Sequence, residues 1–513
     1  MNSEKQEIHS ALFWCCTGLF VLFGAYQAYL TTAWGAGLTT DSLSYLQGAR
    51  SILKNGDLSG LGSHWPPLYF LLISLSISLF QDPLAAIRWL QILTMAANVL
   101  LVAFVLYKAT GRSLVASFTG TVVFITSKTV LWVHCMAWSE AFFCLLALAG
   151  VYFLAEYIRE QEKIFLLVVS ACFIGLAFVT RYVGITLIAT GIAALLLWDR
   201  KKIFHRIGIS IFFGFISSVP MLVWMIRNLL INQAATDRDF IFHPVPMQKI
   251  AFGLRLLSRW LFLPENSPIL LLGVCFLLLA GYIYSLKILS GKEYDWNRML
   301  EICFIFVVIY LGFILFSISF FDAHTPLDQR ILYPVYVFFF VGVVLLYDRL
   351  SRITQFNKLS IFIPILLLFI SFKQYSGQHF FIYNAIENGL GFSSRQWVQS
   401  DILHWLKNIP PTTVIYTNGP DPITIYTDRK SIMIPLHTYP VNKKKNLKFD
   451  AEIDKMKEDL MNNNGVIVYF YSITWRWYLP TLEELKKKMA LNVVYQGKDG
   501  IAVSVHPPTV QDK

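Results

Sequence analysis

The side chains of this chain that are best suited to chemistry lie just outside long apolar runs. Asp41 follows the first of these runs, and Glu140 stands at the start of a later one, in VHCMAWSEAFF. An ionisable group at the edge of membrane depth is costly unless it is paired, bound or functional. We therefore treat both carboxylates as candidate catalytic residues. For each of them the alternative is a helix cap, because a carboxylate there accepts backbone N–H bonds and complements the helix dipole.

Arginines occupy similar positions. Arg181 and Tyr182 interrupt an apolar stretch that otherwise runs from 164 to 198, and Arg330 stands in FFDAHTPLDQRILYP shortly before another apolar run. A guanidinium can bind a phosphate through paired hydrogen bonds. These residues are therefore candidates for substrate binding. The alternatives are a helix-end cap for Arg181 and a local ion pair with Asp328 for Arg330.

The first long loop adds Tyr45 and His64 as candidate substrate contacts. His64 opens the sequence HWPPLY, in which the prolines and aromatic residues suit the start of a helix at a membrane interface. Its alternative role is that of an interfacial histidine with a backbone partner. Asp322 and His324 are too few ligands to indicate a metal site, so no metal ligand is predicted, although a divalent metal remains compatible with the sequence.

A membrane protein has to position these residues. Of the 513 residues, 56% are hydrophobic and 15% are charged, whereas soluble proteins carry about 25% charged residues. The net charge of +11 comes from short basic clusters between apolar runs, a pattern typical of the positive-inside rule rather than of nucleic-acid binding. The predicted spans are 11–30, 66–81, 87–107, 113–132, 138–157, 163–180, 182–198, 206–226, 268–288, 300–320, 331–347 and 358–373. The fold class is therefore a polytopic α-helical membrane protein with about 11–13 transmembrane helices.

The basic clusters also predict an orientation. They place the loops 31–65 and 227–267, the segment 321–330 and the C-terminal part outside the cell membrane. The number of predicted spans conflicts with the basic residue Lys108, which the positive-inside rule places in the cytoplasm. If every run before it crossed the membrane, Lys108 would lie outside. One of the runs 66–81 and 113–132 is therefore expected to be re-entrant or in-plane, and Glu140 shares a side with Asp41 only in that case.

Within the loop 31–65, leucines and other apolar residues recur at helical spacing from Asp41 onward, which predicts an amphipathic helix at the interface. The chain then divides into a membrane domain, 1–373, and an extracytoplasmic α/β domain, 374–513. The second contains an amphipathic stretch, SRQWVQSDILHWLKNI, and helical patterns at 450–462 and 481–489. Predicted strands are 414–417, 424–427, 431–434, 465–471 and 491–496.

The order of these motifs is similar to that of a known superfamily. It combines an acidic residue after the first span, a His-x-Pro-Pro-Leu-like start of the next run, a Ser-Glu that opens a later helix, an Arg-x-Leu-x-Pro run near the last spans, and an α/β tail. In this combination the chain resembles the polyprenyl-phosphate-dependent glycosyltransferases of the GT-C superfamily, especially glycosyltransferase family 39. The resemblance extends over nearly the whole chain.

The resemblance implies transfer of a sugar from a polyprenyl-phosphate carrier to a glycolipid, glycan or protein acceptor outside the membrane. Asp41 matches the family's first-loop acidic residue and would activate the acceptor, while Arg181, Arg330 and His64 would bind the lipid phosphate. The match is incomplete. Ser44 stands where the aminoarabinose-transferase branch has Arg, His64 and Trp65 replace its Glu-Lys pair, and Ser42 replaces the second acidic residue of the protein O-mannosyltransferase branch. The resemblance therefore does not extend to the acceptors of those branches.

Two other functional classes are compatible with a polytopic chain. A transporter or flippase of lipid-linked saccharides would need charged residues deep in the bundle and a repeat between its halves, and the sequence shows neither. A membrane-anchored binding or assembly protein would explain the C-terminal domain, but it would leave the long external loops without a role.

Overall fold

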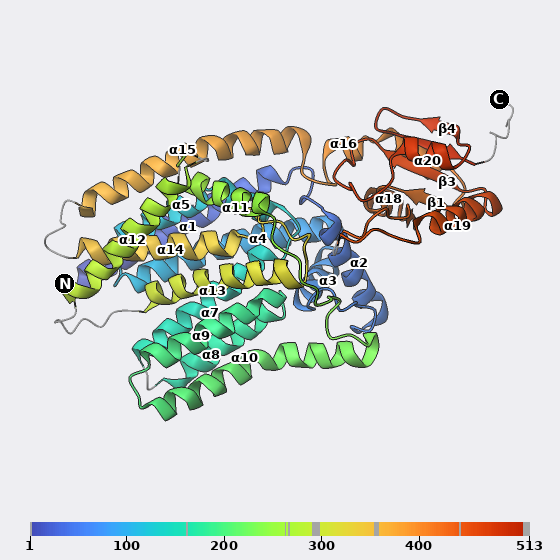
Figure 1. The fold of residues 1–513 in the computed structure, drawn as a ribbon. Coiled ribbons are helices and arrows are strands. Elements are labelled where there is room, and N and C mark those ends of the chain that lie inside the picture. The colour runs from blue at the N-terminus through green and yellow to red at the C-terminus, as the bar shows by residue number, and fades with distance from the viewer. Residues whose placement is uncertain are drawn as a thin grey trace.

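The computed structural model describes residues 3–160, 163–261, 263–264, 267–289, 298–352, 359–440 and 443–505. It consists of a long helical bundle with a smaller α/β domain beyond one of its ends (Figure 1). We call the end of the bundle that faces this domain the domain end. The N-terminus lies at the opposite end of the bundle.

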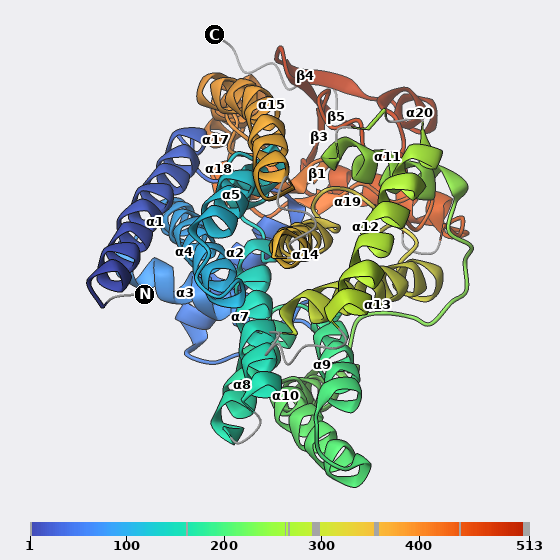
Figure 2. The same ribbon diagram turned by 90° about the vertical axis from the view of Figure 1, so that its left-hand side faces the viewer.

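The bundle and its loops contain the first helices of the chain in order. They are α1 (Ser3–Thr31), α2 (Thr40–Asn55), α3 (Leu68–Phe80), α4 (Pro83–Ala109), α5 (Leu114–Ile125), α6 (Lys128–Cys135), α7 (Glu140–Arg159), α8 (Ile164–Phe178), the short 3₁₀ helix η1 (Tyr182–Gly184), α9 (Ile185–Trp198), α10 (Ile203–Asn232), α11 (Met247–Trp260), α12 (Pro268–Leu289), α13 (Met299–Phe320), α14 (Tyr333–Ser351) and α15 (Leu359–Asn388). Viewed end-on, α8, α9 and α10 project from one side of the bundle (Figure 2).

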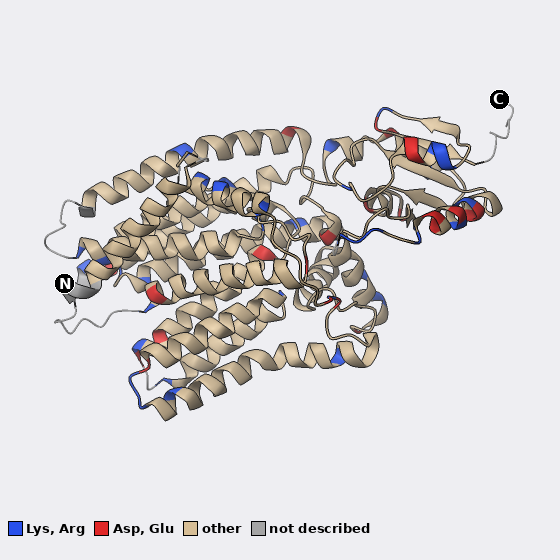
Figure 3. Ribbon diagram, in the orientation of Figure 1, with Lys and Arg blue, Asp and Glu red and all other residues tan. Residues whose placement is uncertain are grey.

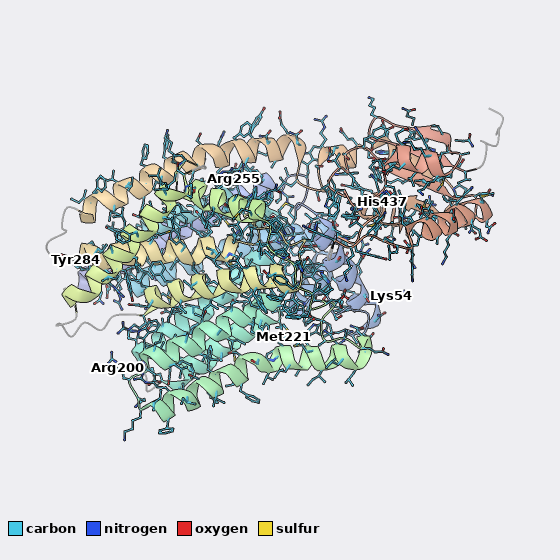
Figure 4. The ribbon with its side chains drawn as sticks, viewed as in Figure 1. Lys54, Arg200, Met221, Arg255, Tyr284 and His437 are labelled. Atoms are coloured by element: carbon cyan, nitrogen blue, oxygen red, sulfur yellow. The ribbon has the colours of Figure 1, made fainter. Side chains whose placement is uncertain are left out.

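The prediction of a polytopic membrane protein is confirmed. Among the described residues, eight helices are long and apolar enough to cross a membrane, and the pair α5 and α6 would make a ninth. Shorter apolar helices occupy 68–80, 164–178 and 182–198. Most charged residues lie toward the two ends of the bundle and on the C-terminal domain (Figure 3). For example, Lys54 lies at the domain end and Arg200 at the opposite end (Figure 4).

The structure resolves the conflict over the run 66–81. Arg88, near the start of α4, donates to the Tyr29 carbonyl at the end of α1, and this contact places the start of α4 at the domain end. Beyond the other end of α4, the Thr110 carbonyl accepts a hydrogen bond from Arg352, which follows α14. Helix α4 therefore crosses the bundle, and α3, with 13 residues, both begins and ends near the domain end. At about 1.5 Å per residue, α3 is too short to span a bilayer core.

The other doubtful run, 113–132, is a broken span rather than a straight helix. Its two halves, α5 and α6, meet at an angle of 59°. The break falls at Thr126 and Ser127, where the Ser127 side chain caps the first turn of α6. Together the two halves return the chain to the domain end, because the Cys135 carbonyl accepts a hydrogen bond from the N–H of Gly37. Glu140 therefore lies at the same end of the bundle as Asp41.

The last long helix, α15, runs to Asn388, beyond the end predicted at 373. The final turns of α15 are more polar than its first turns. The predicted end was too early because a change to polar residues marks the point where a helix leaves the apolar layer, and the helix itself continues beyond it. The predicted division of the chain between 373 and 374 falls inside this helix.

The C-terminal domain holds one five-stranded mixed sheet in the order β2-β1-β3-β5-β4. Strands β2 and β3 pair in parallel with β1, and β5 pairs antiparallel with β3 and β4. Its elements are α16 (Arg395–Val398), α17 (Asp401–Asn408), β1 (Ile415–Thr417), α18 (Pro420–Thr427), β2 (Ile432–Met433), α19 (Phe449–Asn462), β3 (Val466–Phe470), α20 (Leu482–Lys488), β4 (Asn492–Gln496) and β5 (Gly500–Ser504).

The strand predicted at 424–427 is wrong, because these residues form the second half of α18. The helix begins with Pro420 and has Asp421 in its first turn, two features that favour a helix start over the β-branched residues that follow. Strand β5, which lies in the middle of the antiparallel half of the sheet, was not anticipated from the sequence.

Candidate active site

A cluster of four charged side chains lies at the domain end of the bundle. Arg330 is at its centre: Nη1 lies 2.6 Å from Oδ2 of Asp41, and Nε lies 2.5 Å from Oε1 of Glu140. The same Glu140 oxygen is 2.7 Å from Nη1 of Arg181. The structure therefore brings together four residues that are widely separated in the sequence. We call these four residues the ion cluster.

Asp41 reaches the ion cluster from the first turn of α2. It is not the cap of this helix: the N-cap is Thr39, whose N–H donates to the Ser42 hydroxyl. The Ser42 hydroxyl in turn donates to the Ala137 carbonyl and ties α2 to the turn before α7. Thr39 rather than Asp41 is therefore the cap of α2, whereas Asp41 still lies in the first turn, where a carboxylate complements the helix dipole. Its carboxylate is 27% exposed and is the most accessible group of the ion cluster.

Arg330 lies in the loop between α13 and α14. Asp328 shapes this loop, since its Oδ1 accepts the backbone N–H groups of Arg330 and Ile331 at 3.0 Å. The Arg330 guanidinium points away from Asp328 and lies over the Trp138 ring, 4.5 Å from its centre. The local ion pair considered from the sequence is thus replaced by contacts with residues far away in the chain. Burial raises the pKa of the Asp328 carboxyl above its usual range.

Glu140 is the buried anchor of the ion cluster. It opens α7 and is 1% exposed, and it binds both arginines through one oxygen. Within the described part of the chain, its other oxygen has no hydrogen-bond partner. Burial opposes the charge of Arg330, but Glu140 and Asp41 outweigh burial and raise the pKa of this guanidinium. Two positive and two negative charges thus balance inside the ion cluster.

Arg181 and Tyr45 complete the inner wall of the site. Arg181 lies between α8 and η1 and also donates to the Ser139 hydroxyl. The Tyr45 hydroxyl lies 3.2 Å from the same Ser139 oxygen. Tyr45 is buried against the rings of Trp65 and Tyr69, and this burial raises its pKa. Tyr45 therefore stays protonated. Through Ser139 it is connected to Arg181 of the ion cluster.

The structure places His64 and Tyr182 outside the ion cluster. His64 is half-exposed and faces Asp237 of the second long loop, with 3.5 Å between Nδ1 and Oδ2. The Tyr182 hydroxyl donates to the Ser63 carbonyl and fixes the end of the first loop. Neither side chain contacts an arginine of the ion cluster. His64 has a side-chain partner rather than the backbone partner considered from the sequence.

A further arginine near the site was missed by the sequence analysis. Arg238, in the second long loop, has its guanidinium 5.9 Å from the centre of the Tyr182 ring. Burial lowers its pKa, and among the described residues no carboxylate forms an ion pair with it, although Asp322 and Asp237 act on it from a greater distance. In the sequence, Arg238 is one charge among several in ATDRDF, so no local pattern distinguished it.

The described residues provide no group of three or more His, Cys, Asp or Glu side chains that could hold a metal ion. The Asp322 carboxylate accepts bonds from the N–H of His324 and the hydroxyl of Thr325. The Asp322 carboxylate is therefore engaged in its own turn.

Comparisons with known proteins support this fold. A family model described as dolichyl-phosphate-mannose-protein mannosyltransferase matches residues 64–224. No curated protein sequence matches the chain. Among solved structures, ArnT from Cupriavidus metallidurans in the apo state is similar with a TM-score of 0.62 and 14% identity, over 97% of this chain and 98% of that one. The same protein bound to undecaprenyl phosphate gives a TM-score of 0.61 at 13% identity, over 95% and 97% of the two chains.

Two larger proteins share the fold at lower similarity. The archaeal oligosaccharyltransferase AglB from Archaeoglobus fulgidus has a TM-score of 0.51 and 12% identity, over 98% of this chain and 75% of that chain. The mycobacterial arabinofuranosyltransferase AftD has a TM-score of 0.50 and 11% identity, over 95% and 40%. The chain therefore has the fold that these solved proteins share, and the expected polytopic fold with a C-terminal α/β domain is confirmed.

Proposed function

We propose that the chain is an integral membrane glycosyltransferase that moves a sugar from a polyprenyl-phosphate carrier to an acceptor outside the cell membrane. The observation that carries this proposal is Arg330, which joins the accessible Asp41 to the buried Glu140 at the domain end. Such a site places a carboxylate that can activate a nucleophile next to guanidinium groups that can bind a phosphate. In this reading the domain end and the C-terminal domain are extracytoplasmic.

Asp41 acts in this proposal as the general base. The acceptor hydroxyl attacks the anomeric carbon, the bond from this carbon to the phosphate oxygen breaks, and the hydroxyl proton passes to the carboxylate. Asp41 pairs with Arg330 through Oδ2, and no described residue donates a hydrogen bond to Oδ1. A donor phosphate competes with Asp41 for the Arg330 guanidinium, because both are anions that a guanidinium binds through charge-assisted hydrogen bonds.

The arginines stabilise the leaving group. Polyprenyl phosphate departs with its negative charge, so it needs cations rather than an acid. Arg330 and Arg181 are balanced by Glu140 and Asp41 before the donor binds, whereas Arg238 adds a cation without an ion-pair partner among the described residues. We assign Arg330 and Arg238 to the donor phosphate. Glu140 is a positioning residue in this proposal, because it is buried and holds both Arg181 and Arg330.

The comparisons support this class of reaction. The ArnT structure was determined with undecaprenyl phosphate, and the AglB structure with a dolichol-phosphate and an inhibitory peptide. The matching family model carries the name of a dolichyl-phosphate-mannose-dependent transferase. A lipid-linked donor is therefore the substrate class that fits best. The comparisons give no support to the transporter alternative.

The test is the substitution Asp41→Asn in the full-length protein in nanodiscs. We expect transfer of labelled sugar from a polyprenyl-phosphate donor into a membrane extract of a deletion strain to fall by about 10²-fold or more, as expected for loss of a general base. Size-exclusion profile and thermal stability of the variant check its fold. Transfer at the wild-type rate by folded Asp41→Asn protein would refute the role of Asp41.

A further inference from the structure

A cavity of about 560 Å³ lies beside the ion cluster. It is bounded by the start of α2, by the segment that joins α15 to the C-terminal domain, and by one loop of that domain. Its polar lining residues include Thr39, Thr40, Asn388, Ser394 and Gln396, and Trp475 also lines it. We call this space the junction cavity. Its size falls within the range of small-molecule sites, roughly 300–1,000 Å³.

The floor of the junction cavity is backbone held in a fixed arrangement. Leu38 pairs with Gly391, and the N–H of Phe392 donates to the Leu38 carbonyl at 2.8 Å. Gly391 has a φ of +53°, and a Cβ at this position would lie 2.2 Å from the Leu38 oxygen. Only glycine fits this close approach. The first loop and the C-terminal domain therefore meet at a defined geometry, and the cavity is built into the fold.

The lining indicates the chemistry of the ligand. None of the side chains that line the junction cavity is charged. Its walls combine hydroxyl and amide groups with the indole of Trp475, a residue that is 51% exposed. Ser394 is only 8% exposed, and its hydroxyl has no hydrogen-bond partner among the described residues. A buried hydroxyl without a partner costs free energy unless a ligand or water satisfies it.

These features fit a sugar better than other ligands. A sugar ring presents an apolar C–H face that packs on an aromatic ring, and hydroxyls that exchange hydrogen bonds with amides and hydroxyls. An anionic headgroup or a phosphorylated glycan would find no cation in the lining. An acyl chain would leave the Ser394 hydroxyl and the amides of Asn388 and Gln396 without partners.

The junction cavity is next to the reacting groups of the proposed function. Thr40 in its wall directly precedes Asp41. Thr39 accepts a hydrogen bond of 3.0 Å from the Trp138 indole N–H, and the ring of Trp138 lies below Arg330. A ligand in the cavity thus contacts the residue that directly precedes Asp41. It lies on the side of α2 that faces the C-terminal domain.

We propose that the junction cavity binds an uncharged saccharide that forms the acceptor, and that this saccharide presents a hydroxyl to Asp41. This inference rests on the proposed glycosyltransferase function. It specifies the substrate class as a neutral glycan or the neutral glycan part of a glycolipid. Trp475 provides the stacking surface, and the side chains of Ser394, Asn388 and Gln396 provide hydrogen bonds.

The experiment measures glycan binding without any donor. Full-length protein in nanodiscs is applied to an array that carries neutral oligosaccharides, acidic and phosphorylated oligosaccharides, and peptides. We expect binding to neutral oligosaccharides, and at least a tenfold weaker affinity for Trp475→Ala. Gln396→Ala is expected to weaken binding less, because it removes one hydrogen-bonding group and leaves the stacking surface.

The matched control is Trp477→Ala. Trp477 lies two positions along the same loop and is 55% exposed, but it does not line the junction cavity. Its replacement is expected to leave binding unchanged. Equal binding by the Trp475 and Trp477 variants, or binding confined to acidic glycans or peptides, would overturn the proposal. Donor consumption by wild-type and Asp41→Asn protein tests the proposed function separately, because the array measurement involves no catalysis.

Discussion

Arg330 provides the sharpest test of the ion cluster, and Arg330→Lys is the most informative change. Arg330 contacts Asp41 and Glu140 through two different nitrogen atoms and lies over the Trp138 ring. A lysine keeps the positive charge, but its single ammonium lacks the planar fork that reaches both carboxylates. The substitution therefore separates the geometry of the guanidinium from its charge.

The size of the effect follows from the contacts that are lost. One hydrogen bond to a charged group is worth about 1.5–3 kcal/mol, and the cation–π contact is worth about 0.5–2 kcal/mol. Together they give a loss of roughly 2–5 kcal/mol. At 1.36 kcal/mol per factor of ten, this corresponds to a decrease of kcat/KM by about 30- to 5,000-fold.

The assay is sugar transfer from a labelled polyprenyl-phosphate donor by full-length protein in nanodiscs. Arg50→Lys serves as the control, because Arg50 pairs with Asp428 at 3.6 Å and both side chains are exposed, at 46% and 89%. An exposed pair of this kind contributes at most about 1 kcal/mol, so we expect less than a threefold change. If Arg330→Lys were as active as Arg50→Lys, the two-sided contact of Arg330 would have no part in the reaction.

Two other predictions concern the same site. Glu140→Gln removes the buried counter-charge of Arg181 and Arg330 and should destabilise the folded protein by about 3–5 kcal/mol, measured by thermal unfolding. The control is Glu483→Gln, which breaks an exposed ion pair with Lys486 and should change the free energy of unfolding by less than about 1 kcal/mol. Equal effects of the two substitutions would contradict the role of Glu140. Burial raises the pKa of Asp328, so the folded state binds the carboxyl proton more tightly than the unfolded state does. The free energy of unfolding therefore falls as the pH rises from about 3.9, the ordinary value of an aspartate, through the raised pKa of the folded state. The unfolding temperature of wild type minus that of Asp328→Asn should decrease across this window and stay constant above it; a difference that grows with pH would refute the assignment.

The features that could be predicted from the sequence are those that depend on local interactions along the chain. Apolar runs of sufficient length predicted the spans, and helical spacing of apolar residues predicted α2. The ionisable residues at the edges of these runs were identified as candidates because charges are costly there. The same local reasoning erred at 424–427, where β-branched residues suggested a strand but the proline at the start of α18 and its packing favour a helix.

Which candidate residues lie next to one another depends on how the helices pack. Whether Glu140 lies beside Asp41 depends on α3 turning back instead of crossing, and a run of 13 apolar residues is ambiguous between these two paths. Arg330 had a sequence neighbour, Asp328, that was a plausible ion-pair partner, yet its guanidinium binds Asp41 and Glu140 from distant segments. Ion pairs between such segments depend on the packing of the whole bundle. Local sequence therefore identified the charges, and the packing of the helices selected the partners.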